Sequence, residues 1–270
     1  MIKHIFKSCT VVLVLFFFSG LAWSEEDHPP VMDIVSQANH MAYYQGQDGR
    51  ARVTMHITDQ QDRERNKEFT ILRKDLGDED TEQKFYVYFH RPSDERGTVF
   101  MVWKHIGKDD DRWLYLPALD VTKRIAASDE RTSFVGSDFY YEDVSGRGIH
   151  EDDHELAEVT ENYYVVKSRP KNPELVEFDY YLNYVHKKSF IPVKTEYFRE
   201  DGSKYREMTV QQVKDIQGFT TITKQQMADL ESGSTTVITY ESVEYNIGLP
   251  EDIFTERYLR RAPRKYLRSQ

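Results

Sequence analysis

Cysteine and long apolar runs are both scarce in this sequence. The single cysteine, Cys9, lies at the start of an apolar run, residues 11–23, which two lysines and no acidic residue precede. The run is shorter than the roughly 20 residues that a membrane-spanning helix needs. It ends in Ala22-Trp23-Ser24, a small-x-small site. The pattern predicts a secretory signal peptide, residues 1–24, and an uncleaved anchor is the alternative.

Cleavage near Ser24 leaves a chain without cysteine. This excludes disulfide bonds and thiolate chemistry from the mature protein. Cys9 does not follow a Leu-x-small triplet at the end of the apolar run, so we do not expect it to carry a lipid. An exported, aromatic-rich chain without cysteine favours the bacterial periplasm.

Basic residues are outnumbered as well. The chain has 36 Lys and Arg against 46 Asp and Glu, which gives a formal charge of −10. Nucleic-acid binding depends on neutralising phosphates, so this balance argues against a nucleic-acid partner. It also argues against simple adsorption to anionic lipid headgroups. Because no linker and no strong repeat interrupts residues 25–270, we expect one domain, and we expect it to be a monomer.

One early helix and many strands are predicted. Apolar residues at helical spacing follow two prolines in residues 29–44. In residues 51–58, Ala51, Val53, Met55 and Ile57 alternate with polar residues, as in a half-buried strand. Further strand-like runs continue to residue 245, with turn signals such as Asp201-Gly202 between them. A short helical turn is expected from Pro250. The pattern predicts an antiparallel meander that curves into an open or closed barrel.

Several predicted strands carry large side chains on both faces, as in residues 85–89, FYVYF. One face can fill a core, but the other must be covered by helices or by an apolar ligand. A well-packed sheet without any ligand is the alternative. A concave, largely apolar surface is the usual form of a small-molecule site.

The stretch HEDDHE, residues 150–155, matches H-E-x-x-H, a pattern of zinc metalloproteases. That chemistry requires both histidines on one face of a helix. Here Gly146-Arg147-Gly148 precedes the stretch and disfavours a buried helix. We therefore interpret the stretch as an acidic hairpin connection that leads into the next strand. A zinc-dependent hydrolase stays open as an alternative function.

A series of short motifs gives the chain a family resemblance. They are, in order, Arg91-Pro92, then Asp111, Trp113, Tyr115 and Pro117, then GSDFYYED at residues 136–143, PVKTEYF at residues 192–198 with the Asp201-Gly202 turn, and Phe254-Thr255. In this order they resemble the periplasmic outer-membrane lipoprotein carriers, the LolA/LolB-like proteins. The branch labelled outer-membrane lipoprotein-sorting protein is the most similar.

The resemblance implies an incompletely closed antiparallel β-barrel, mainly β with a few helices, whose helical lid covers an apolar cavity. It implies binding of lipoprotein or lipid acyl chains and transport towards the outer membrane. An inner-membrane exporter and an outer-membrane acceptor are the implied partners. Arg91 is implied as a lid latch. No catalytic residue, metal or cofactor is expected, and a non-lipid periplasmic scaffold or binding domain is a further alternative.

We expect the cavity lining to come from alternate residues of several strands. The candidates are Val53, Met55, Phe85, Val87, Phe89, Phe100, Val102, Trp113, Tyr115 and Phe139. A one-residue error in register would exchange the two faces of a strand.

The loop after Arg91-Pro92 departs from the family pattern, in which an aromatic residue follows closely. Here the sequence reads Ser93-Asp94-Glu95-Arg96-Gly97. Since this loop hands over the cargo in the carriers, a free lipid competes with a lipoprotein as the cargo.

The stretch FVGSDFYYEDVSG, residues 134–146, places aromatic residues beside carboxylates. We expect Ser128-Asp129-Glu130 to cap a short helix running through Phe134. We expect Phe139, Tyr140 and Tyr141 to point partly into the interior. We expect Asp138, Glu142 and Asp143 to stay in water or to bind nearby backbone and arginine groups. The segment would then belong to the lid, and a purely structural turn is the alternative.

Overall fold

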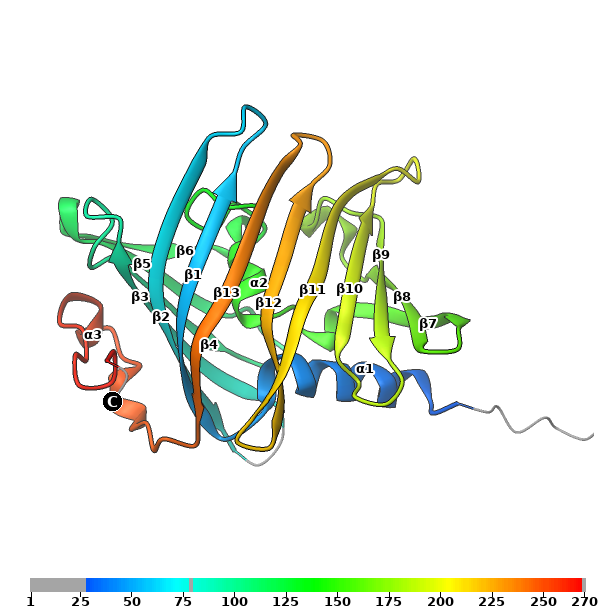
Figure 1. Cartoon of the computed structure of the whole chain (residues 1–270), viewed down its shortest axis with the longest axis horizontal. Helices are drawn as coiled ribbons and strands as arrows, with labels where there is room; N and C mark the ends of the chain where they lie inside the picture. The colour runs from blue at the N-terminus through cyan, green and yellow to red at the C-terminus, as the bar shows by residue number, and fades with distance from the viewer. Residues whose placement is uncertain (1–27, 78–79, 269–270) are drawn as a thin grey trace, which may run out of the picture.

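The structure, a computed structural model, describes residues 28–77 and 80–268 (Figure 1). The predicted signal peptide lies outside these residues. Within them, no helix is both long enough and apolar enough to cross a membrane.

One antiparallel sheet of 13 strands forms most of the molecule. The strands are β1 (Asp48–Thr58), β2 (Glu64–Leu76), β3 (Glu82–Arg91), β4 (Val99–Lys104), β5 (Asp111–Leu116), β6 (Val121–Ile125), β7 (Asp152–Val159), β8 (Tyr163–Pro170), β9 (Tyr180–His186), β10 (Pro192–Phe198), β11 (Lys204–Ile216), β12 (Phe219–Asp229) and β13 (Ser234–Tyr245).

The helical elements are short. They are α1 (Val31–Asn39), its π-helical continuation η1 (His40–Tyr44), η2 (Pro117–Leu119), η3 (Ala127–Asp129), α2 (Tyr141–Ser145), η4 (Ile149–Glu151), η5 (Pro173–Leu175), η6 (Glu251–Ile253) and α3 (Arg257–Arg260). The expected mainly β architecture with few helices and an unclosed barrel is confirmed.

The strand order explains how the concave side of the sheet is filled. It runs β6-β5-β4-β3-β2-β1-β13-β12-β11-β10-β9-β8-β7, so the chain starts in the middle, reaches one edge and must return from the other. Residues 126–151 make this crossing. Because Phe134, Phe139 and Tyr141 pack in the same apolar cluster as alternate residues of β1 to β4, the crossing runs inside the curved sheet. Figure 1 shows α2 behind the strands.

Strict alternation along the strands divides the core into two layers. On β3, Phe85, Val87 and Phe89 face the concave cluster, whereas Tyr86 and Tyr88 face a second cluster on the convex side. Burying both faces of a strand with large side chains requires covering segments on both sides. Residues 126–151 cover the concave side.

The C-terminal segment covers the convex face of β2 to β5. Leu249, Phe254, Leu259 and Leu267 are buried there among alternate residues of these strands. The indole nitrogen of Trp103 donates a hydrogen bond of 2.7 Å to the Phe254 carbonyl. The basic C-terminal stretch thus packs on the sheet up to residue 268.

The predicted early helix is confirmed as α1 and η1, which lie across one end of the sheet (Figure 1). Ile34 and Ala38 are buried against Val166 and Val185 of β8 and β9. The expected helical turn after Pro250 is confirmed as η6.

The expected short helix through Phe134 is wrong. After η3 the chain makes a tight turn in which Val135 and Gly136 both have positive φ, 49° and 78°. The amide of Phe134 donates to the carbonyl of Phe139, and Ser133 bridges to Tyr140. A glycine in the left-handed region favours such a turn over a continued helix, so the helix of this segment begins only at Tyr141.

Candidate functional site: an apolar cavity under the crossing segment

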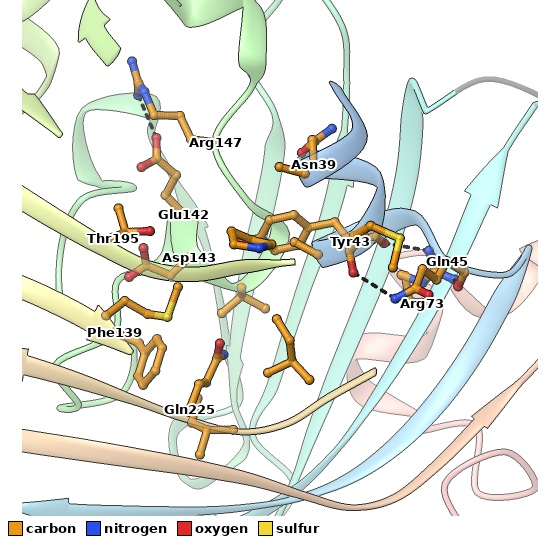
Figure 2. A pocket seen from close by; sticks show the side chains of 18 of the residues that line it. Asn39, Tyr43, Gln45, Arg73, Phe139, Glu142, Asp143, Arg147, Thr195 and Gln225 are labelled. Carbon is orange, nitrogen blue, oxygen red and sulfur yellow. Dashed lines mark hydrogen bonds and ion pairs between the residues drawn. The ribbon is translucent and has the colours of Figure 1, made fainter. Parts of the chain in front are cut away.

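A cavity of about 300 Å³ lies between the concave face of the sheet, the α1–η1 helix and α2 (Figure 2). Its volume is at the lower end of the roughly 300–1,000 Å³ typical of ligand sites. The lining is mostly apolar, with residues from both halves of the sheet. The apolar lining includes Val35, Ala38, Met41, Ala42, Ala51, Phe69, Ile71, Phe85, Val87, Phe134, Phe139, Val144, Val166, Val185, Met208, Ile222, Ile238 and Val243.

Most of the predicted lining residues share the concave cluster. Three of the predicted residues line the cavity directly: Phe85, Val87 and Phe139. Five more lie in the same cluster without lining the cavity: Val53, Met55, Phe89, Phe100 and Val102. Phe89 packs between Phe69 and Phe134, with ring centroids 5.1 and 5.9 Å away.

The other predicted residues lie elsewhere. Trp113 and Tyr115 belong to the convex cluster, where Trp113 packs against Trp103 with centroids 4.9 Å apart. On β5, Leu114 faces the concave side instead. The expectation that Trp113 and Tyr115 line the cavity therefore has to be corrected, because the alternation places them on the opposite face.

Arg91 is at the end of β3 and is largely exposed. Its guanidinium lies 3.5 Å from Glu68 of the neighbouring strand, which also binds Arg52 at 2.7 Å. These contacts join strands to each other rather than a lid to the sheet. The latch role of Arg91 stays an expectation of the resemblance.

Buried ion pairs hold α2 over the cavity. The carboxylate of Glu142, which is 2% exposed, binds Arg131 and Arg147, the latter at 2.8 Å. The next residue, Asp143, binds the buried guanidinium of Arg206 on β11. In the 134–146 stretch, Glu142 and Asp143 therefore bind arginines. The third carboxylate, Asp138, instead accepts hydrogen bonds from the hydroxyls of Ser234 and Thr236.

The surroundings of these groups shift their pKa values. Burial alone would raise the pKa of Glu142, but Arg131 and Arg147 outweigh it and leave this pKa below its usual range. Burial would likewise raise the pKa of Glu177, yet the hydrogen bond and charge of Arg131 lower it to about 2. Both carboxylates are therefore ionised at neutral pH and hold their arginines.

Sequence reasoning missed a tyrosine at the centre of the site. Tyr43 of η1 projects into the cavity in Figure 2, and its carbonyl accepts a hydrogen bond of 2.6 Å from Arg73 of β2. Arg73 also donates to the carbonyls of Gln45 and Gly46. A β2 arginine thus fixes the end of the helix, and no local sequence signal distinguishes it from a solvated arginine.

The Tyr43 ring packs directly on Gly146, which follows α2. A Cβ atom at Gly146 would lie 2.6 Å from this ring, and the φ of Gly146 is +78°. Both the close approach and the left-handed backbone therefore require glycine here.

We predict that Gly146→Ala is more destabilising than Gly202→Ala. Gly202 has a similar φ of +80°, but nothing lies within 4 Å of its Cβ position. Both variants bear the backbone strain, and only the first must also displace Tyr43, an overpacking effect of about 1–3 kcal/mol. Urea unfolding of the two variants measures the difference, and equal losses of stability would show that the ring yields freely.

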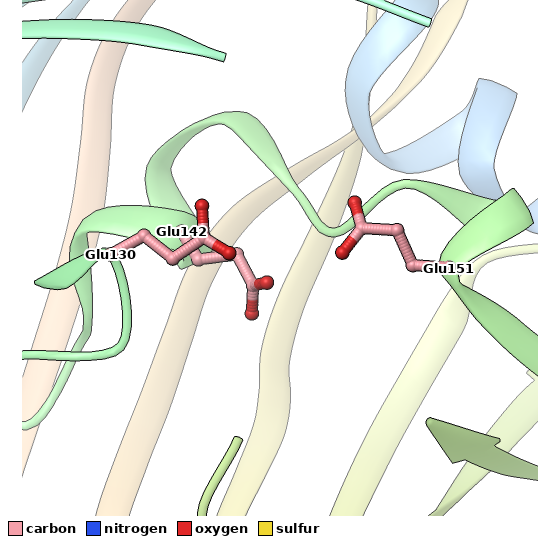
Figure 3. Close-up of side chains that lie close together, drawn as sticks. All are labelled: Glu130, Glu142 and Glu151. Atoms are coloured by element: carbon pink, nitrogen blue, oxygen red, sulfur yellow. The ribbon is translucent and has the colours of Figure 1, made fainter. Parts of the chain in front are cut away.

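An acidic trio adjoins the ion pairs (Figure 3). Glu130, Glu142 and Glu151 offer oxygens that lie within 4.8 Å of one another. Burial raises the pKa of Glu130 to about 7, although Arg112 opposes this. Arginines bind all three carboxylates, so we interpret the trio as part of the ion-pair network rather than as a metal centre.

The H-E-x-x-H stretch does not form a helix. His150 lies in η4, whereas His154 lies in β7 and its ring contacts Ser168 and the Ile149 carbonyl at 2.7 Å each. The two histidines therefore lack the one-turn spacing that a zinc-binding helix provides. This geometry removes the motif's support for a zinc-dependent hydrolase.

A family model with the description "-like: Uncharacterized protein" matches residues 81–261, more than half of the chain. The chain belongs to this family. No curated protein matches it.

The comparison with solved structures identifies the fold as that of the LolA superfamily. A DUF1329 family protein from Desulfovibrio piger is 25% identical, with a TM-score of 0.76 over 86% of this chain and 100% of that one. A "putative outer membrane lipoprotein-sorting protein domain" from Vibrio parahaemolyticus is 24% identical, with a TM-score of 0.76 over 85% and 98%. A LolA superfamily protein from Nitrosomonas europaea is 20% identical, with a TM-score of 0.67 over 86% and 100%. The predicted resemblance to the LolA/LolB-like proteins is confirmed for the fold.

Proposed function

We propose that this protein is a periplasmic carrier that binds the acyl chains of a lipoprotein or lipid in the cavity. The observation that carries the proposal is the mostly apolar cavity in the concave face of a LolA-superfamily sheet. The name of the Vibrio parahaemolyticus structure, which refers to lipoprotein sorting, supports the same cargo class. In this proposal the protein acts by binding and transport and catalyses no reaction.

The physical reason for such a carrier is the cost of exposing acyl chains to water. Each methylene that leaves an apolar environment costs about 0.8 kcal/mol, so unassisted transfer between membranes is slow. A cavity that accepts the chain lowers this cost without any covalent step. An inner-membrane exporter would supply the cargo and an outer-membrane acceptor would receive it.

The segments that cover the cavity differ in how firmly they are held. The crossing segment is fixed by buried ion pairs. In contrast, α1 contacts β8 and β9 through apolar side chains such as Ile34 and Ala38, and the hydrogen bonds from Arg73 hold only its η1 end. Segments that move are drawn from the less stable parts of a fold. We therefore propose that α1, rather than α2, opens to admit the cargo.

The proposal predicts that the protein purified from periplasm carries lipid. Mass spectrometry of organic extracts should detect an acyl lipid at near-stoichiometric amount, and delipidated protein should bind a fluorescent acyl probe saturably. Metal analysis of the same sample tests the hydrolase alternative. Extracts without lipid, together with no saturable uptake of any acyl probe, would favour a non-lipid scaffold or binding domain.

A further inference from the structure

The arginines that border the cavity already form ion pairs with carboxylates. Arg147 lies 2.8 Å from Glu142 and 2.9 Å from Asp152. Arg73 lies 3.0 Å from Asp75. It also donates hydrogen bonds to the main-chain carbonyls of Gln45 and Gly46, which follow η1. An anionic headgroup inside the cavity would have to compete with these partners.

The remaining charged residues of the lining are also paired. Asp143 binds Arg206, and Glu244 binds Arg50 at 2.5 Å. The ring of His154 is held between a serine hydroxyl and a main-chain carbonyl. In the part of the chain that the structure describes, every Arg, Asp and Glu of the cavity lining therefore has an oppositely charged partner.

Neutral polar groups are available instead. Asn39, Tyr43, Thr195 and Gln225 surround the pocket in Figure 2, and Asn183 joins them in the lining. Within residues 28–77 and 80–268, the Tyr43 hydroxyl and the Asn39 and Asn183 amide nitrogens donate no hydrogen bond to another side chain or carbonyl. Such groups can donate to a carbonyl oxygen of a ligand.

We infer that the cavity selects acyl chains whose polar end is uncharged, such as an ester or an amide, over chains that end in a free carboxylate. This inference rests on the proposed carrier function and specifies its ligand. A neutral ester carbonyl can accept hydrogen bonds from Tyr43 or Asn183 at little cost. A carboxylate in the same place would be a buried charge whose neighbouring cations are already bound, which is strongly unfavourable. The lining arginines pair with carboxylates, and the Lys104 ammonium, 5.7 Å from the centre of the Tyr43 ring, donates to the carbonyls of Ser145 and Gly146.

The test compares two ligands with the same chain. Monododecanoylglycerol and dodecanoic acid compete with a neutral pyrene-labelled acyl ester for the delipidated protein at neutral pH, below their micellar concentrations. We expect the ester to displace the probe at a concentration about tenfold or more below that of the acid.

A cation placed inside the cavity should weaken this preference for the ester. Gln225→Lys introduces an unpaired cation into the lining and should tighten binding of dodecanoic acid several-fold relative to the ester. Gln226→Lys is the matched control, because Gln226 is next on β12, faces the opposite side and contacts Gln211. It should leave the ratio of the two affinities at the wild-type value.

Two results would overturn the inference, and they are distinguishable. Equal binding of the acid and the ester by the wild-type protein would remove the selectivity and leave the carrier proposal intact. If the two ligands and the probe all fail to bind saturably, the carrier proposal itself is wrong, and the inference is wrong with it. The wild-type comparison decides even if Gln225→Lys does not fold.

Discussion

Replacing Arg206 with methionine should lower the free energy of unfolding by about 3–5 kcal/mol, which is the usual cost of removing one partner of a buried ion pair. Arg206 is 1% exposed, and Asp143 would lose its one charged partner among the described residues. Stacking on Tyr140, 3.9 Å from the guanidinium, would be lost as well. Urea unfolding followed by circular dichroism measures the loss.

The matched control is Arg169→Met. Arg169 pairs with Asp179 at 2.8 Å, but both side chains are well exposed, 47% and 39%. Exposed pairs contribute at most about 1 kcal/mol, so this variant should stay close to wild type. If Arg206→Met unfolds no more easily than the control, the buried network does not hold α2 in place.

The alternation of side chains made one layer of the fold predictable. Val53 and Met55 alternate with the polar residues Arg52, Thr54 and His56. The structure buries Val53 and Met55 in the concave cluster, together with Phe85, Val87 and Phe89. Trp113 and Tyr115 could not be assigned in this way, since β5 has no polar alternation to fix its register. Its sequence, DRWLYL, carries large side chains at adjacent positions.

The ion-pair network could not be predicted for a different reason. Arg131, Arg147 and Arg206 resemble solvated charges in a chain with 30% charged residues. Their burial follows from topology, because the connection from β6 to β7 must cross the inside of the sheet. A local sequence pattern does not determine the order of distant strands. Residues 134–146 alone therefore could not predict that this segment crosses the sheet or which arginines its carboxylates bind.

Filling the cavity should abolish acyl binding without unfolding the protein. Ala51 of β1 lines the cavity and is only partly buried, so Ala51→Phe can extend its ring into the empty space. We expect binding of a neutral fluorescent acyl probe to weaken by more than about tenfold, since a side chain would occupy the volume that the chain requires. Urea unfolding should stay near wild type, because the added ring fills space rather than overpacking a close-packed core.

The same substitution on the other face separates this effect from a general loss of structure. Ala228 lies on β12 next to Met227, which faces the concave cluster, so the Ala228 side chain faces away from the cavity. Ala228→Phe should therefore bind the probe as the wild type does. If Ala51→Phe also binds normally, acyl chains do not enter this cavity. If both variants lose binding, the change reflects a disturbed sheet rather than a filled site.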